Sequence, residues 1–169
     1  MTAFEELLSG SNLRSIGKVN DVISRVHTQH DFDQLFNLLY NDDRIVAMRA
    51  ADAIEKITVQ DREFLLKHSG QILSLCRSAM NKEFKWHLAQ LLPRLFLNQD
   101  QLTEARLILH NWAANKGNSR IVRVNALQGL FDLTDNKEDL QPFLTGLEEE
   151  RVPSINARIR RLNKLTGEL

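Results

Sequence analysis

Residue types that could support chemistry first occur together at His27, His30, Asp31 and Asp33, a run of two imidazoles and two carboxylates. Histidines three positions apart on one helix can share a metal ion with a nearby carboxylate. The run spans a predicted break between two helices, and no second cluster in the sequence completes a ligand shell. We therefore predict no metal ion here, and we keep a metal-dependent enzyme only as the third of three functional hypotheses.

Cys76 is the only cysteine, which excludes an intramolecular disulfide and any site with several thiolate ligands. A catalytic thiol needs a nearby base and an electropositive setting. Cys76 instead shares a predicted apolar face with Ile72 and Leu73, so we expect it in the core. The sequence also has no glycine-rich phosphate loop, no Gly-x-Ser-x-Gly and no His-Glu-x-x-His. We accordingly predict that the protein is not an enzyme and that it binds no cofactor.

A polar stripe lies in the segment 83–97, where His87, Gln90 and Arg94 fall at i, i+3 and i+7 and so share one side of a helix. Two interpretations stay open, namely hydrogen bonding between neighbouring helices and contact with a peptide or ligand. Trp86 and Trp112 likewise fit either core packing or an exposed binding anchor. The residues that we single out for partner binding are Trp86, His87, Gln90, Arg94, Trp112, Arg123 and Asn125.

The composition is that of an ordinary folded protein rich in helices. The chain has only 3 prolines and 7 glycines in 169 residues, too few for a many-turned β-sandwich. Basic and acidic residues balance at 22 each, whereas a dedicated nucleic-acid-binding protein normally has a positive excess. The first residues lack the apolar run of a secretory signal, and no stretch is long enough to cross a bilayer. We expect a cytoplasmic protein with no membrane partner.

Apolar residues recur with helical spacing from Lys18 onward, beginning with Val19, Val22, Ile23 and Val26. In the helix predicted over 44–58, the spacing puts these residues on one side: Val46, Ala50, Ala53, Ile54 and Ile57. We predict a loosely packed N-terminal extension over residues 1–17, interrupted at Ser9-Gly10-Ser11-Asn12, and a single domain over residues 18–169. The predicted helices begin near residues 18, 31, 44, 61, 71, 83, 100, 120, 136 and 153.

Helix ends are predicted from capping residues and helix breakers. Asp31 with Gln34 fits an N-cap and its capping-box partner. Further along the chain, N-caps are also predicted at Asp43, Asn81 and Asp100. Gly117 fits the left-handed residue just beyond a helix. Pro93 costs about 3 kcal/mol in an ideal helix interior, so we expect a kink there in a helix spanning 83–97.

Sliding the chain against itself reveals an internal repeat. The triplet Arg44-Ile45-Val46 recurs as Arg120-Ile121-Val122. At half that shift, about 38 residues, Ile54 aligns with Leu92. At the full shift Ile54 aligns with Leu130, and Ala50 aligns with Ala126. A period of this length is typical of stacked two-helix repeats.

The repeat resembles the HEAT/armadillo-type helical-repeat superfamily. The segment Asp43-Arg44-Ile45-Val46-Ala47-Met48-Arg49-Ala50-Ala51-Asp52-Ala53-Ile54 is similar to the HEAT pattern of an acidic turn followed by valine, arginine and paired alanines. The resemblance covers Lys18 to Leu165 and implies an all-α fold, a right-handed superhelix of roughly four to five antiparallel helix pairs. A narrower likeness, carried by Trp86–Arg94 and Ser119–Leu127, is to small bacterial HEAT-like proteins of no established activity.

In that family the turn aspartate and the helix arginine form a polar ladder between repeats. Here the Asp43 position becomes asparagine and then serine in the later repeats. The Arg49 position becomes His87 and then Asn125. The sequence therefore supports the ladder in one repeat only.

The resemblance implies a non-enzymatic scaffold or adaptor that binds a protein or peptide along the surface lined by the second helix of each pair. The alternative is nucleic-acid binding, similar to HEAT-like DNA glycosylases that hold alkylated DNA in a basic groove. It requires cations gathered on one face, and the candidates are Lys82, Lys85, Arg94, Arg123, Arg158 and Arg161. The basic last helix fits either a polar capping repeat or a contact site.

Overall fold

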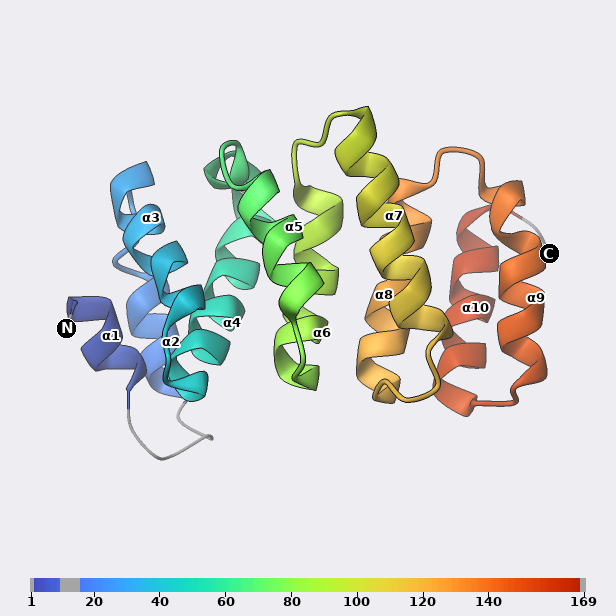
Figure 1. Cartoon of the computed structure of the whole chain (residues 1–169), viewed down its shortest axis with the longest axis horizontal. Helices are drawn as coiled ribbons and strands as arrows, with labels where there is room; N and C mark the ends of the chain where they lie inside the picture. The colour runs from blue at the N-terminus through green and yellow to red at the C-terminus, as the bar shows by residue number, and fades with distance from the viewer. Residues whose placement is uncertain (1, 10–15, 168–169) are drawn as a thin grey trace. The chain divides into compact units, whose positions relative to one another are not determined.

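The structure is a computed structural model that describes residues 2–9 and 16–167, and within these ranges the regular secondary structure is all helical, with no strand (Figure 1). The α-helices are α1 (Ala3–Leu8), α2 (Ile16–Ile23), α3 (Gln29–Asn37), α4 (Arg44–Gln60), α5 (Ser69–Ser78), α6 (Lys82–Leu91), α7 (Gln99–Ala114), α8 (Arg120–Leu133), α9 (Gln141–Glu149) and α10 (Pro153–Leu165). Short 3-10 turns are η1 (Leu38–Tyr40), η2 (Arg62–Leu65), η3 (Leu92–Arg94) and η4 (Lys137–Leu140). The predicted all-α class is confirmed.

The chain divides into two compact units. The N-terminal unit comprises residues 1–68 and 94–96, and the C-terminal unit comprises residues 69–93 and 97–169. None of the described helices is long and apolar enough to span a membrane.

Helix α4 is the centre of the N-terminal unit, where α1, α2, α3, η1 and η2 all pack on it. Its buried face includes Val46, Ala50, Ala53, Ile54 and Ile57, the side that the apolar spacing predicted. Alanines in the middle of this face let neighbouring helices approach closely, while the longer aliphatic side chains fill the space beside them.

Helix α1 is packed more firmly than the sequence suggested. Thr2 and Glu5 form a reciprocal capping box at its start, and Phe4 and Leu8 are both buried. The buried guanidinium of Arg49 donates a 2.6 Å hydrogen bond to the carbonyl oxygen of Leu8. The expectation of loose packing is therefore wrong for residues 2–9. The predicted interruption at residues 10–12 lies outside the described residues, and the domain boundary at residue 17 stays a prediction.

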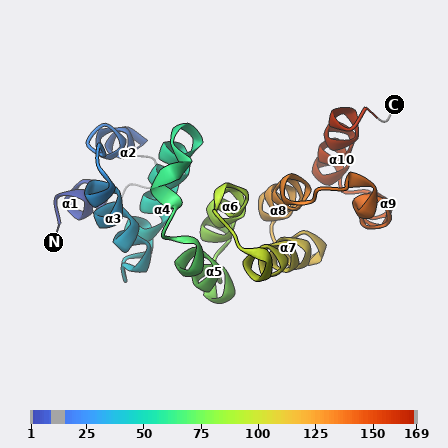
Figure 2. The same ribbon diagram turned by 90° about the horizontal axis from the view of Figure 1, so that it is seen from above.

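The helices of the C-terminal unit pack in sequential pairs. Helix α8 packs against both α6 and α10, while α5 packs against α7. Helix α7 also packs on α8, and α9 packs on α10. Within this unit α6, α8 and α10 therefore form one layer and α5, α7 and α9 the other (Figure 2).

The positions aligned by the internal repeat share their burial. Ile54, Leu92 and Leu130 are all buried, as are Ala50 and Ala126. Each helix therefore presents the same repeat positions to a core, which is the packing that a repeated apolar pattern requires.

Helix α6 ends before Pro93 instead of bending through it. The α-helix stops at Leu91, and the chain continues as the 3-10 turn η3 from Leu92 to Arg94. A proline offers no N–H to the carbonyl four residues earlier, here that of Ala89, and its ring crowds that carbonyl. The prediction of one kinked helix over residues 83–97 is corrected to a shorter helix and a tight turn.

Three predicted caps lie elsewhere. The N-cap of α3 is Thr28, and Asp31 is its capping-box partner. The N-cap of α7 is Asn98. Gly117 does not adopt a positive φ. Among the described residues, Gly167 is the only glycine that does. The Gly117 N–H instead donates to the Oδ1 of Asn115. At the starts of α3 and α7 a neighbouring side chain with equal capping ability takes the role.

Candidate functional site

Trp86 and His87 lie side by side on α6. Their rings stack with centroids 4.7 Å apart and planes inclined by 25°. His87 is buried, whereas Trp86 and Gln90 are half-buried. The polar stripe on α6 is thus mostly covered, and Trp86 is the residue of this stacked pair that reaches the surface.

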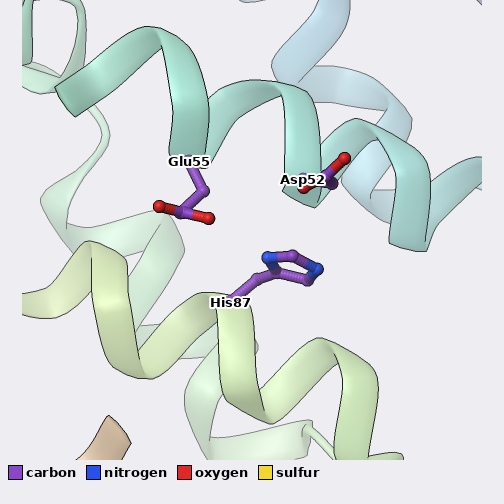
Figure 3. A group of neighbouring side chains, drawn as sticks. All are labelled: Asp52, Glu55 and His87. Atoms are coloured by element: carbon purple, nitrogen blue, oxygen red, sulfur yellow. The ribbon is translucent and has the colours of Figure 1, made fainter. Parts of the chain in front are cut away.

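Arg94 has its hydrogen bonds within the N-terminal unit. Its Nη1 donates to the carbonyl oxygen of Glu55 at 2.5 Å and to Thr58 Oγ1 at 3.0 Å, and its Nη2 lies 3.2 Å from Glu55 Oε1. Glu55 and Asp52 project from successive turns of α4 (Figure 3). The Asp52 carboxylate is paired in turn with Lys56 at 2.8 Å. The Arg94 side chain is therefore bonded to α4 within the N-terminal unit.

Trp112 fills the core, because only 8% of it is exposed. The Lys85 ammonium lies 5.7 Å from the centre of the Trp112 ring. The Asn118 side-chain amide donates to the backbone carbonyl oxygen of Trp112 at 3.1 Å. Lys85 also donates to Asn118 Oδ1 at 3.3 Å. These contacts tie α6, the end of α7 and the loop that follows together, in line with core packing rather than an exposed anchor.

Arg123 is a buried arginine that joins three elements of the C-terminal unit. Only 4% of it is exposed, its Nε donates to the carbonyl oxygen of Ala113 at 2.7 Å, and its Nη2 lies 2.8 Å from Glu150 Oε2. Asn125 is half-buried and donates to the carbonyl oxygen of Ile121 in its own helix. Inter-helix bonding thus accounts for Arg123, whereas Asn125 bonds only locally.

Arginine donation to carbonyl oxygens near helix ends recurs through the chain. Arg49 reaches Leu8 at the end of α1, and Arg123 reaches Ala113 at the end of α7. Arg106 reaches Leu133 at the end of α8 with its Nε at 2.8 Å. The last carbonyls of a helix have no partner in the helix and carry partial negative charge. A guanidinium donates hydrogen bonds to them and compensates part of that charge.

The His27 run does not converge on one point. Both histidines are exposed, and Asp31 accepts hydrogen bonds from Thr28 at its own helix start. Asp33 faces away into a separate network with Lys67 at 2.5 Å and the buried ring of His68 at 2.9 Å. The carboxylates of Asp31 and Asp33 are thus both engaged in hydrogen bonds within the fold.

The network around Asp33 perturbs its ionisation. Partial burial acts to raise the pKa of Asp33, but hydrogen bonds from Lys67, Gln29 and His68 outweigh burial and lower that pKa to about 2. The His68 ring stacks on Phe36 with centroids 3.9 Å apart. Asp33 therefore stays ionised as part of the packing between α3 and the segment before α5.

Cys76 is buried, as predicted. Burial raises the pKa of its thiol well above the ordinary value, and the negative charge of Glu104 adds to that effect. The thiolate is the nucleophilic form, so a raised pKa makes Cys76 an inert core residue.

An open pocket of about 410 Å³ lies at the start of α8, within the C-terminal unit. It is lined by Lys116, Asn118, Ser119, Arg120, Arg123, Glu150 and Val152. Of these, only Arg123 was singled out from the sequence. The cationic members come from the α7–α8 loop and the first turn of α8, and a cluster of basic residues around Ser119 was the available signal in the sequence.

Comparison of this chain with protein-family models, with curated proteins and with solved structures finds no significant match.

Proposed function

We propose that this chain is a non-enzymatic scaffold or adaptor that binds a protein or peptide and is built as a right-handed, HEAT-like stack of helix pairs. The observation that carries the proposal is the two-layer packing of the C-terminal unit, in which α6, α8 and α10 share one layer and α5, α7 and α9 the other. The shared burial of Ile54, Leu92 and Leu130 supports a common repeat. Stacked helix pairs of this kind typically expose extended binding surfaces.

The roles of the polar side chains support binding rather than catalysis. Arg94, Arg123 and Asp33 are each held in hydrogen bonds that join helices, and the Cys76 thiol is kept protonated by burial. Groups committed in this way stabilise the fold and are not poised to react. The exposed surface is then the part of the molecule that is available for function.

The binding surface is proposed on the layer of α5, α7 and α9, which are the second helices of the pairs. Leu107 of α7 is 59% exposed there. The nearby ring of His110 stacks on Phe143 of α9, with centroids 4.1 Å apart. An exposed leucine beside a ring pair offers the apolar contact that a peptide side chain needs.

Affinity capture with matched variants tests the proposal. Leu107→Arg changes the proposed surface, whereas Val59→Arg makes the same type of change at a residue of α4 that is 66% exposed. We expect a partner captured by the wild type to be lost with Leu107→Arg and retained with Val59→Arg. Equal capture by both variants contradicts the surface. A hydrolase or transferase activity that a single substitution abolishes contradicts the non-enzymatic function.

Nucleic-acid binding is the second candidate, favoured by the basic lining of the pocket at α8. Of the cations put forward for it, four are already hydrogen-bonded within the protein, namely Lys85, Arg94, Arg123 and Arg158. That leaves fewer charges for phosphates than the sequence suggested. Fluorescence anisotropy with single- and double-stranded oligonucleotides tests it, and binding that weakens steeply with added salt is the expected signature.

A further inference from the structure

The pocket at the start of α8 is bounded by two connections of the C-terminal unit. Lys116, Asn118 and Ser119 belong to the loop between α7 and α8, and Glu150 and Val152 belong to the turn between α9 and α10. Its volume of about 410 Å³ and its open mouth admit a small ligand or one group of a larger molecule.

Positive charge exceeds negative charge in this lining. Lys116, Arg120 and Arg123 face one carboxylate, Glu150. Glu150 is already paired with Arg123. Among the described residues, the side chains of Lys116 and Arg120 have no hydrogen bond or ion pair, and both residues are exposed. Two cations therefore remain available for an incoming anion.

Arg123 is fixed in place before any ligand arrives. Its bonds to Ala113 and Glu150 use its Nε and Nη2, and a guanidinium carries five N–H donors. Because the side chain is buried and held at two points, it loses little conformational freedom when a further donor is engaged.

The start of α8 lacks a side-chain cap. Ser119 occupies the N-cap position in an extended conformation, but its side chain accepts no hydrogen bond from the first turn. By contrast, the N-caps of α6 and α7, Asn81 and Asn98, both accept one. The first amides of α8 are thus without the acceptor that those helices have, and such amides attract anions.

The hydroxyl of the half-buried Ser119 is a second feature of this helix start. Its Oγ is shielded from solvent and has no hydrogen-bond partner in the structure. A shielded polar atom without a partner is uncommon and calls for an explanation. Rotation about one side-chain bond turns this hydroxyl toward a group bound at the helix start, where it can donate a hydrogen bond.

We infer that this pocket binds a dianionic phosphoryl group, with Lys116, Arg120 and the uncapped first turn of α8 as its contacts and Arg123 as a pre-positioned donor. Two unpaired cations match the charge of a phosphomonoester better than that of a single carboxylate. The inference concerns a site on α8 and does not depend on the peptide surface proposed for α7 and α9.

Titration of the full chain with inorganic phosphate, followed by amide NMR at low ionic strength, tests the inference. We expect saturable shifts centred on the amides of Ile121 and Val122, with no such shifts from chloride at matched ionic strength. The double variant Lys116→Ala/Arg120→Ala should weaken binding about tenfold or more, because charge-assisted hydrogen bonds are lost. Arg160→Ala, at an exposed position of α10, should leave it unchanged.

Ser119→Asp provides a second, independent variant. An aspartate at the N-cap supplies its own carboxylate to the first amides of α8, so we expect phosphate binding to be lost while thermal stability rises. A loss of binding caused by misfolding would lower stability instead. Retained phosphate binding in this variant contradicts the site.

Phosphoserine, a peptide containing phosphoserine and a single-stranded oligonucleotide distinguish the sources of the phosphoryl group. Competition by phosphoserine alone supports a free phosphomonoester, and tighter binding of the peptide supports a modified protein. The inference is overturned by tighter binding of the oligonucleotide, by shifts spread over basic residues across the surface, or by the absence of saturable shifts.

Discussion

A Cβ atom added to Gly129 of α8 would lie 2.8 Å from the carbonyl oxygen of Ala89 in α6. Real Cβ atoms essentially never come so close to a backbone oxygen. The carbonyl of Ala89 is the one whose usual donor, the N–H four residues later, is missing because residue 93 is proline. The proline that ends α6 and the glycine that admits α8 thus occur at the same contact between the two helices.

Gly129→Ala should therefore destabilise the fold. The new methyl group would also meet both Leu109 Cδ atoms at 3.2 Å, so α6 and α8 must move apart. Overpacking of this kind costs about 1–3 kcal/mol, against a gain of at most about 1 kcal/mol in helix propensity, so we expect a net loss of up to about 2 kcal/mol. Urea unfolding measures the difference.

Gly146→Ala is the matched control for that substitution. Gly146 lies inside α9, and nothing is within 4 Å of an added Cβ atom. The same substitution there should stabilise the fold by roughly 0.5–1 kcal/mol. Destabilisation at both positions would show that helix contact is not the reason.

Arg123→Met should lower stability by about 2–4 kcal/mol. Glu150 would remain a largely buried carboxylate without its partner, and the Ala113 carbonyl would lose a donor. Adding Glu150→Gln to Arg123→Met should recover part of the loss, because the unpaired charge is removed. Additive effects of the two changes in a double-mutant cycle would contradict coupling between these side chains.

Stability should fall in acid as Asp33 is protonated. Its pKa is lowered from the ordinary 3.8 to about 2 in the folded chain. A lowered pKa means that its contribution is present above pH 3.8 and is lost as the pH falls toward 2. The contribution is about 1–2 kcal/mol, since the carboxylate is partly exposed and screened. Asp33→Asn should flatten the stability profile below pH 4 relative to the wild type, and an unchanged slope would refute the assignment.

Arg151→Gly should stabilise the protein. Arg151 follows α9 with φ of 55°, a left-handed conformation that costs a residue with a Cβ about 1–2 kcal/mol. Glycine removes that cost, but it also raises the entropy of the unfolded chain, which opposes folding. We therefore expect the free energy of unfolding to increase by only roughly 0.5–1 kcal/mol. Thermal unfolding measures this increase in stability. Arg151→Ala keeps the strained backbone conformation, so this variant should be no more stable than the wild type.

Local patterns in the sequence were enough to predict most of the helices and the buried face of α4, but not the packing of α1 or the end of α6 at Leu91. Apolar spacing located the core side of α4, and Asp43 and Asn81 cap the helices that they precede. The prediction of the N-cap failed where two suitable residues lie close together, as with Thr28 and Asp31. Both can accept from first-turn amides, and only packing decides between them.

Contacts between distant residues could not be predicted in the same way. Arg123 reaches Ala113 and Glu150 because three helix ends meet in space, which no spacing along the chain encodes. The close approach of Gly129 to Ala89 is of the same kind. The pocket at α8 combines loop residues whose side chains converge only once α7, α8 and α9 are packed.

Amide hydrogen exchange of the full chain, with and without a captured partner, tests the proposal that the layer of α5, α7 and α9 binds a protein or peptide. We expect slower exchange in α7 and α9 when the partner is bound, with α6, α8 and α10 unchanged. Protection confined to α6, α8 and α10 would contradict it.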